Sequence, residues 1–140
     1  VECARKEDDI DHLKQKVDSG CDFMTTQMFF NNDVLYHFLY RTLAKGIDIP
    51  VVAGIMPVTN AAQINRIISL SGTYLPPRFK SMVEKFENNP EAMLQAGIAY
   101  TTEQIIDLIC NGVNRIHLYT MNKPEIAAAI FKNLSSIIGA

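Results

Sequence analysis

The sequence predicts an α/β protein in which parallel strands alternate with helices as successive β/α units. Three short, apolar segments that suit β-strands are separated by longer segments whose apolar residues recur at helical spacing. A glycine precedes each strand-like segment, at Gly20, Gly46 and Gly112, where it can end the helix before it. Strands joined through helices lie parallel with right-handed crossovers, so the pattern indicates an open doubly wound sheet or part of a (β/α) barrel.

The first half of the chain contains two of these units. The apolar spacing of residues 10–17 predicts a first helix with one buried face. Residues 23–30 are short and apolar and predict the first strand, and the asparagine pair that follows can cap a helix. Residues 50–55 are almost wholly apolar, as expected of a second strand that is covered on both faces.

The second half continues the alternation with a longer helical region. After a loop at residues 56–60, three helical segments follow in succession. Residues 115–119 predict the third strand, and Pro124 can begin a closing helix. A complete eight-stranded (β/α) barrel needs about 250 residues, so these three strands would form only part of one.

Composition excludes several classes of protein. The chain of 140 residues has a formal net charge of -2, without the basic surface expected of a nucleic-acid-binding protein. No apolar run approaches the roughly 20 residues of a membrane span, and no apolar signal core opens the chain. Since the chain begins without methionine, we expect it to belong to a longer protein.

The three cysteines, Cys3, Cys21 and Cys110, lie far apart and form no CxxC pair. No histidine stands at a zinc-finger offset from them, so we expect no metal site. The odd number of cysteines favours reduced thiols and a cytoplasmic location.

The carboxyl ends of the three predicted strands are where a ligand is expected, because ligands of parallel α/β folds bind there. Each strand turns polar at this point, in residues 27–31, 56–60 and 119–123. Gln27 and His117 also stand in otherwise apolar strand segments, where burial without partners is costly. For Gln27, a ligand contact and a hydrogen bond within the core are equally expected. For a single strand histidine such as His117, the core hydrogen bond is favoured.

A polar stripe on the first helix is a second candidate site. Asp9, His12 and Lys16 stand at i, i+3 and i+7. Lys16 could meet a phosphate, and Asp9 could accept a hydrogen bond from a ribose hydroxyl. From the residues alone, a solvated helix face is favoured over a binding site. The sequence has no GxGxxG, Walker, HExxH or GxSxG motif, so a dinucleotide would bind without a Rossmann fingerprint.

Several segments resemble the methylenetetrahydrofolate reductases. The segments are KQKVDSGCDFMTTQMFF at 14–30, GIMPV at 54–58 and HLYTMN at 117–122, with shorter matches at 75–76, 97–99 and 112–113. Their order and spacing match the family over essentially the whole chain. The resemblance implies that residues 1–140 are the C-terminal portion of a (β/α)8 barrel reductase domain, with its last three strands and no second domain.

The resemblance also implies roles for individual residues. The positions that match flavin-contacting residues of the family are Asp9, His12, Gln15 and Lys16. The positions that match folate- or nicotinamide-contacting residues are Gln27, Gln63 and Lys123. Two positions depart from the enteric-type pattern. Lys123 replaces an arginine, so the paired hydrogen bonds that a guanidinium can donate are lost while the positive charge is kept. Ile67 replaces a phenylalanine that stacks near the substrate.

The implied activity is that of a cytoplasmic flavoprotein of one-carbon metabolism and methionine biosynthesis, expected to be a homo-oligomer. NAD(P)H reduces FAD, and the flavin then passes hydride to 5,10-methylenetetrahydrofolate to give 5-methyltetrahydrofolate. The family's catalytic glutamate and flavin-tuning aspartate have no counterpart here. We therefore expect no catalytic residue in this chain and no reductase activity from these 140 residues alone.

Two other functions stay open. The chain could belong to another folate- or pterin-binding barrel, such as a corrinoid methyltransferase domain. It could also be a non-catalytic half-barrel that serves binding or assembly, since an incomplete barrel exposes sheet edges that can pair with another chain.

Overall fold

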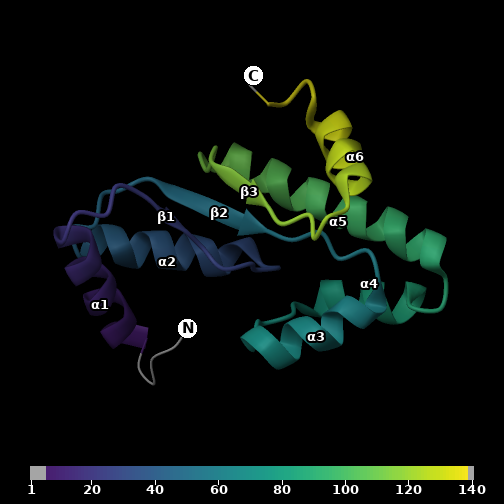
Figure 1. Cartoon of the computed structure of the whole chain (residues 1–140), viewed down its shortest axis with the longest axis horizontal. Helices are drawn as coiled ribbons and strands as arrows, with labels where there is room; N and C mark the ends of the chain where they lie inside the picture. Colours follow the sequence, from purple (N-terminus) through teal and green to yellow (C-terminus); the bar gives the residue numbers. More distant parts are fainter. Residues whose placement is uncertain (1–5, 139–140) are drawn as a thin grey trace.

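The computed structural model describes residues 6–138 and shows an α/β fold with a three-stranded parallel sheet (Figure 1). Over this range the order of helices and strands is the one predicted. The elements are α1 (Lys6–Asp18), β1 (Met24–Thr25), α2 (Asn32–Ala44), β2 (Val51–Ile55), α3 (Ala61–Ser71), α4 (Pro77–Phe86), α5 (Pro90–Cys110), β3 (Ile116–Leu118) and α6 (Pro124–Leu134).

The sheet has the strand order β1-β2-β3, so the first and third strands flank the second. Thr25 is paired with Val52, and Gly54 is paired with His117. Because paired residues of neighbouring strands point to the same face, these four residues share one face of the sheet. The carboxyl ends of all three strands lie at one edge, as parallel strands require.

The first strand is much shorter than residues 23–30, the range that the sequence predicts. The backbone N–H of Thr26 still donates to the Val52 carbonyl oxygen at 3.0 Å. The next ladder bond would join the Gly54 N–H to the Thr26 carbonyl oxygen. Instead, the Gly54 N–H donates to the Thr26 side-chain Oγ1 at 2.9 Å. A side-chain hydroxyl thus replaces the backbone acceptor, and the regular strand ends there.

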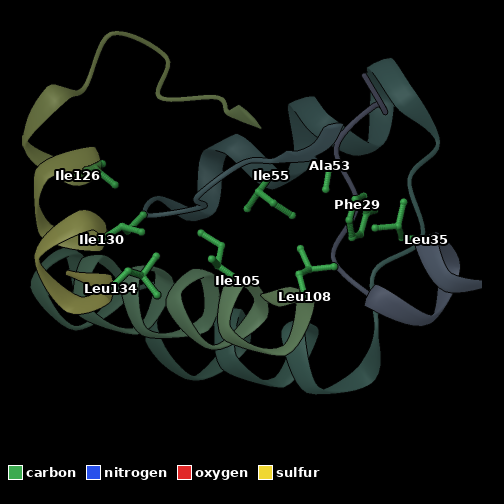
Figure 2. Packing of buried hydrophobic residues seen from close by; sticks show 9 residues of the cluster. All are labelled: Phe29, Leu35, Ala53, Ile55, Ile105, Leu108, Ile126, Ile130 and Leu134. Atoms are coloured by element: carbon green, nitrogen blue, oxygen red, sulfur yellow. The ribbon is translucent and has the colours of Figure 1, made fainter. Parts of the chain in front are cut away.

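Helices α2, α5 and α6 cover one face of the sheet (Figure 2). Ala53 and Ile55 of β2 are fully buried, and Leu108 of α5 and Ile130 of α6 pack in the same cluster. This arrangement explains the wholly apolar side of β2. Among residues 6–138, no helix covers the opposite face. Thr25 and His117 lie on this face and are exposed.

A second apolar cluster lies beyond the carboxyl end of β2, where α3, α4 and the start of α5 meet (Figure 1). Its aromatic centre is Phe79, whose ring stacks on Phe30 with the centroids 4.6 Å apart and meets Tyr100 edge-on at 5.1 Å. Ile67 is also buried in this cluster. Its side chain therefore packs in the core.

Capping signals fix where the helices begin. The Asn31 side chain accepts a hydrogen bond from the Asp33 backbone N–H, and the α4 and α5 helices begin with proline. The start of α2 agrees with the sequence prediction, because asparagine supplies the acceptor that free N–H groups need. Proline suits the first turn of α4 and α5 because it lacks the N–H altogether.

Candidate functional site

The residues with predicted folate roles each follow one of the three strands, at their common carboxyl edge. Gln27 comes two residues after β1, Gln63 lies in the first turn of α3 after β2, and Lys123 precedes α6 after β3. The fold therefore brings three residues that are far apart in sequence to one edge of the sheet. This is the edge at which parallel α/β proteins bind ligands.

The open face of the sheet beside this edge carries polar side chains. Thr25, Gln27 and His117 are all exposed. The prediction that His117 is a hydrogen-bonded core residue is therefore wrong, because nothing in the described chain covers this face of β3. Its ring instead meets the Tyr119 ring edge-on, with the centroids 4.5 Å apart.

Gln27 keeps most of its amide available. Its Oε1 atom accepts from the Met28 backbone N–H at 3.3 Å. Of the two readings that the sequence left open for this residue, a hydrogen bond to a neighbour within the core does not hold, since the side chain is exposed. The amide can donate and accept hydrogen bonds at the rim of the open face.

Gln63 has a structural role that the sequence analysis missed. Its Oε1 atom accepts from the backbone N–H groups of Thr59 and Asn60, both at 3.1 Å, while the Asn60 side chain caps the helix in return. This is a capping box, and its signal was an Asn followed three residues later by a Gln. The oxygen of Gln63 is thus engaged, and its Nε2 group is the part that can serve a ligand.

Lys123 is half-buried at the N-terminus of α6, and the loop before it has an unusual backbone. Met121 and Asn122 have φ angles of 51° and 60°, in the left-handed region. That conformation is uncommon for a residue with a long side chain and costs free energy. The turn brings the chain from β3 into α6 within five residues, which keeps Lys123 close to the carboxyl edge.

A surface depression lies on α1, the helix that leads into β1. It is lined by His12, Gln15, Lys16 and Ser19. Three of the four residues with a predicted flavin role therefore lie together. Asp9 is half-buried on the same helix but does not line the depression. Ser19 was missed by the sequence analysis, although its spacing from His12 and Lys16 is helical and could have revealed it.

The lining of this depression suits the phosphate and ribose portions of a dinucleotide. Lys16 supplies an ammonium charge, and the Gln15 amide supplies a neutral donor and acceptor. The Ser19 hydroxyl donates to the Gln15 backbone carbonyl oxygen at 2.8 Å, so its oxygen is left to accept. The neighbouring cation Lys14 is paired with Asp18 instead and is not part of the lining. A positive charge beside a neutral amide donor is a set of groups that fits an anion.

A cleft between α2, α4 and α5 is lined by Arg78, Glu103 and Asp107, whose side chains are paired within the protein. Arg78 donates to both carboxylate oxygens of Glu103, which holds the pKa of Glu103 below its usual value. Burial and the hydrogen bond to Asp107 raise the pKa of Tyr36 to about 12. These pairs join α4 to α5 and α2 to α5.

The sequence also gives expectations about metal sites, membrane spans and cysteines. Among residues 6–138, no group of three or more His, Cys, Asp and Glu side chains could hold a metal ion. Within the same range, no helix combines the length and apolar character of a membrane span. Cys21 and Cys110 are free thiols, and Cys3 lies outside the described residues.

A family model and two related proteins point to the same family. The family model described as methylenetetrahydrofolate reductase matches residues 2–135. Methylenetetrahydrofolate reductase (NADH) 1 of Arabidopsis thaliana is 34% identical over 129 residues, which are 92% of this chain and 22% of that protein. The 5,10-methylenetetrahydrofolate reductase of Pectobacterium carotovorum is 32% identical over 126 residues, 90% of this chain and 42% of that protein.

A solved structure has a similar fold. It is described as an uncharacterized protein from Clostridium thermocellum that binds two copies of 5-methyl-5,6,7,8-tetrahydrofolic acid. The TM-score is 0.57 at 18% identity, and the match covers 95% of this chain and 49% of that one. This chain therefore corresponds to about half of that structure and to less than half of the two reductases.

Proposed function

Since the chain belongs to the methylenetetrahydrofolate reductase family, we propose that it carries part of the flavin and folate site of a reductase. The parent protein reduces 5,10-methylenetetrahydrofolate to 5-methyltetrahydrofolate with FAD and NAD(P)H. Residues 1–140 supply the last three strands of its eight-stranded barrel. The catalytic acid comes from residues outside these 140. The parent protein acts in the cytoplasm as a homo-oligomer.

The observation that carries this proposal is the common edge at which Gln27, Gln63 and Lys123 follow three adjacent parallel strands. Gln27, two residues after Thr25, adjoins a sheet face on which Thr25 and His117 are exposed. Polar side chains at and after the carboxyl ends of the strands are what a ligand at the C-terminal face of a barrel needs. The neighbour from Clostridium thermocellum, described as binding a methylated tetrahydrofolate, supports a folate as that ligand.

Each residue has a separate task in this proposal. Lys16 neutralises phosphate charge of FAD, while His12 and Gln15 hydrogen-bond to it and Asp9 accepts a hydrogen bond from its ribose hydroxyl. When bound, the flavin supplies the hydride chemistry. Gln27 and the Nε2 group of Gln63 hydrogen-bond to the folate, and Gln27 serves the nicotinamide in its turn. Lys123 attracts an anionic group of the substrate through its ammonium charge.

The test is Gln27→Ala in the full-length protein. Losing a hydrogen-bonding group that the ligand satisfies costs about 1–3 kcal/mol, so kcat/KM for methyltetrahydrofolate with menadione as acceptor should fall by about 5- to 150-fold. Gln95→Ala is the matched control, because Gln95 is an exposed glutamine on α5, on the helical side of the sheet. If both variants retain wild-type kinetics, Gln27 has no role in folate binding.

Two alternatives can be separated from the reductase by simple measurements. A folate-binding barrel without flavin would bind methyltetrahydrofolate and show no flavin absorbance after purification. A half-barrel that serves only assembly would bind neither. The reductase requires both a flavin spectrum and its bleaching by NAD(P)H.

A further inference from the structure

We propose that Tyr119 is a positioning residue, which holds the ligand-bearing end of β1 and so fixes the place of Gln27. This inference rests on the proposed function, because it concerns how the residue with the predicted folate contact is held. In the sequence, Tyr119 is the first residue of the polar segment 119–123 that follows the third predicted strand.

The key contact joins two strands that are not neighbours. The Tyr119 hydroxyl donates to the Thr26 backbone carbonyl oxygen at 3.3 Å. Tyr119 directly follows β3 and Thr26 directly follows β1, while β2 lies between those strands. The phenol side chain therefore passes across β2, along the open face of the sheet, to reach the far strand.

Gly54 of β2 makes this crossing possible. A Cβ atom built on Gly54 would stand 2.4 Å from the Thr26 carbonyl oxygen and 2.9 Å from Cε2 of Tyr119. Both distances are shorter than real Cβ atoms tolerate. The strand must therefore have glycine where the tyrosine crosses it, which is a common meaning of glycine inside a strand.

The Thr26 carbonyl needs such a partner because the sheet ladder has ended. Its regular donor would be the Gly54 N–H, which instead bonds to the Thr26 hydroxyl at 2.9 Å. The two bonds hold the same residue: Gly54 binds the Thr26 side chain, and Tyr119 binds the carbonyl of the Thr26–Gln27 peptide. Gln27 begins at the next backbone atom, so the direction of its side chain depends on how this peptide is held.

The Tyr119 ring is itself held in place. The His117 ring meets it edge-on, at a centroid distance of 4.5 Å and an interplanar angle of 75°. Tyr119 is half-buried even though it stands on the open face. His117 and Gly54 of β2 already confine the Tyr119 ring. The side chain therefore loses little further conformational entropy when its hydroxyl forms the hydrogen bond.

The experiment is a double-mutant cycle in the full-length protein with Tyr119→Phe and Gln27→Ala. Tyr119→Phe removes only the hydroxyl and should lower kcat/KM for methyltetrahydrofolate about 3- to 10-fold, as expected for one lost hydrogen bond. In the Gln27→Ala background the same change should have less than about a 2-fold further effect, because its consequence passes through Gln27. Flavin retention should stay at the wild-type level in both.

Two further variants make the test specific. Thr26→Val removes the hydroxyl that accepts from the Gly54 N–H and so loosens Thr26 independently of Tyr119. Its effect should also vanish in the Gln27→Ala background. Tyr36→Phe is the matched control: its hydroxyl bonds to Asp107 on the helical side. It should leave folate kinetics unchanged.

The outcomes separate the inference from the proposed function. If Gln27→Ala is itself without effect, the folate role fails and the positioning role fails with it. If Gln27→Ala is defective but Tyr119→Phe is silent, or equally harmful in both backgrounds, only the positioning role is overturned. A loss of folate activity in Tyr36→Phe as large as that in Tyr119→Phe would also overturn it.

Discussion

Gly97 of α5 lies directly against Val58, so that a Cβ atom built on Gly97 would stand 2.0 Å from the Val58 carbonyl oxygen. The obstructing atom belongs to the backbone and cannot rotate away. The long helix and the loop after β2 are therefore in contact through their main chains. That loop leads into the capping box of Thr59, Asn60 and Gln63, and α5 thus supports one arm of the candidate site.

Gly97→Ala should destabilise the protein, although alanine is the better helix former by about 1 kcal/mol. The clash with the Val58 backbone should outweigh this gain and leave a net loss of about 1–3 kcal/mol, as overpacking does. Thermal unfolding measures the change. Ala99→Gly, at an exposed position of the same helix, measures the difference in helix propensity between alanine and glycine without a clash. A Gly97→Ala protein that is more stable than wild type would mean that the loop yields at little cost.

The two roles of Gln63 can be separated by a pair of substitutions. Gln63→Ala removes the acceptor for the Thr59 and Asn60 N–H groups and should cost about 0.5–2 kcal/mol of stability, as the loss of a helix cap does. Gln63→Glu keeps that acceptor and should keep the stability, because glutamate also completes a capping box.

Gln63→Glu nevertheless lacks the amide donor. We expect its kcat/KM for methyltetrahydrofolate to fall about 3- to 10-fold, the loss expected for one hydrogen bond. Thermal unfolding and steady-state kinetics of both variants are the measurements. Normal folate kinetics in a stable Gln63→Glu protein would reduce this residue to a helix cap.

Lys16→Ala should release flavin more readily from the full-length protein. Charge-assisted hydrogen bonds are worth about 1.5–3 kcal/mol, so flavin affinity should fall by about 10-fold or more. Fluorescence of released flavin on dilution measures this change. Lys14→Ala is the control on the same helix, because Lys14 is paired with Asp18 and does not line the depression. Equal flavin release from the two variants would show that the charge on α1 is only a solvated face.

The order of helices and strands could be predicted because local signals are strong at each boundary. Asn31 caps α2, and apolar spacing marks the buried helix faces. The length of β1 could not be predicted, because Thr26 ends the ladder through its own side chain. Nothing in the apolar segment 23–30 distinguishes a backbone acceptor from a hydroxyl acceptor.

Part of the candidate site could also be predicted from local sequence patterns. Helical spacing brought His12 and Lys16 together, and both line the depression on α1. The interpretation of His117 as a core residue was wrong because it assumed that both faces of every parallel strand are covered. Contacts across the sheet, such as Tyr119 with Thr26, depend on register and on a glycine between them, and no local pattern reveals them.

The open face also bears on how these 140 residues behave on their own. Among residues 6–138, β1 and β3 each have a strand neighbour on one side only. Phe23 beside β1 is 59% exposed, and Met121 beyond β3 is 58% exposed. Unpaired strand edges next to exposed apolar side chains favour association with another chain.

We therefore expect the 140-residue polypeptide, purified alone, to self-associate or to fold only in part, and to lack reductase activity. General acid catalysis typically contributes about 10²–10⁴-fold, and the proposed acid lies outside these residues. Sedimentation velocity with added FAD, together with an NAD(P)H–menadione assay, tests both statements, and the full-length protein is the control. A monodisperse monomer that binds FAD and turns over would show that the flavin site is contained in these residues. The proposed place of this chain as the closing part of a larger barrel would then be wrong.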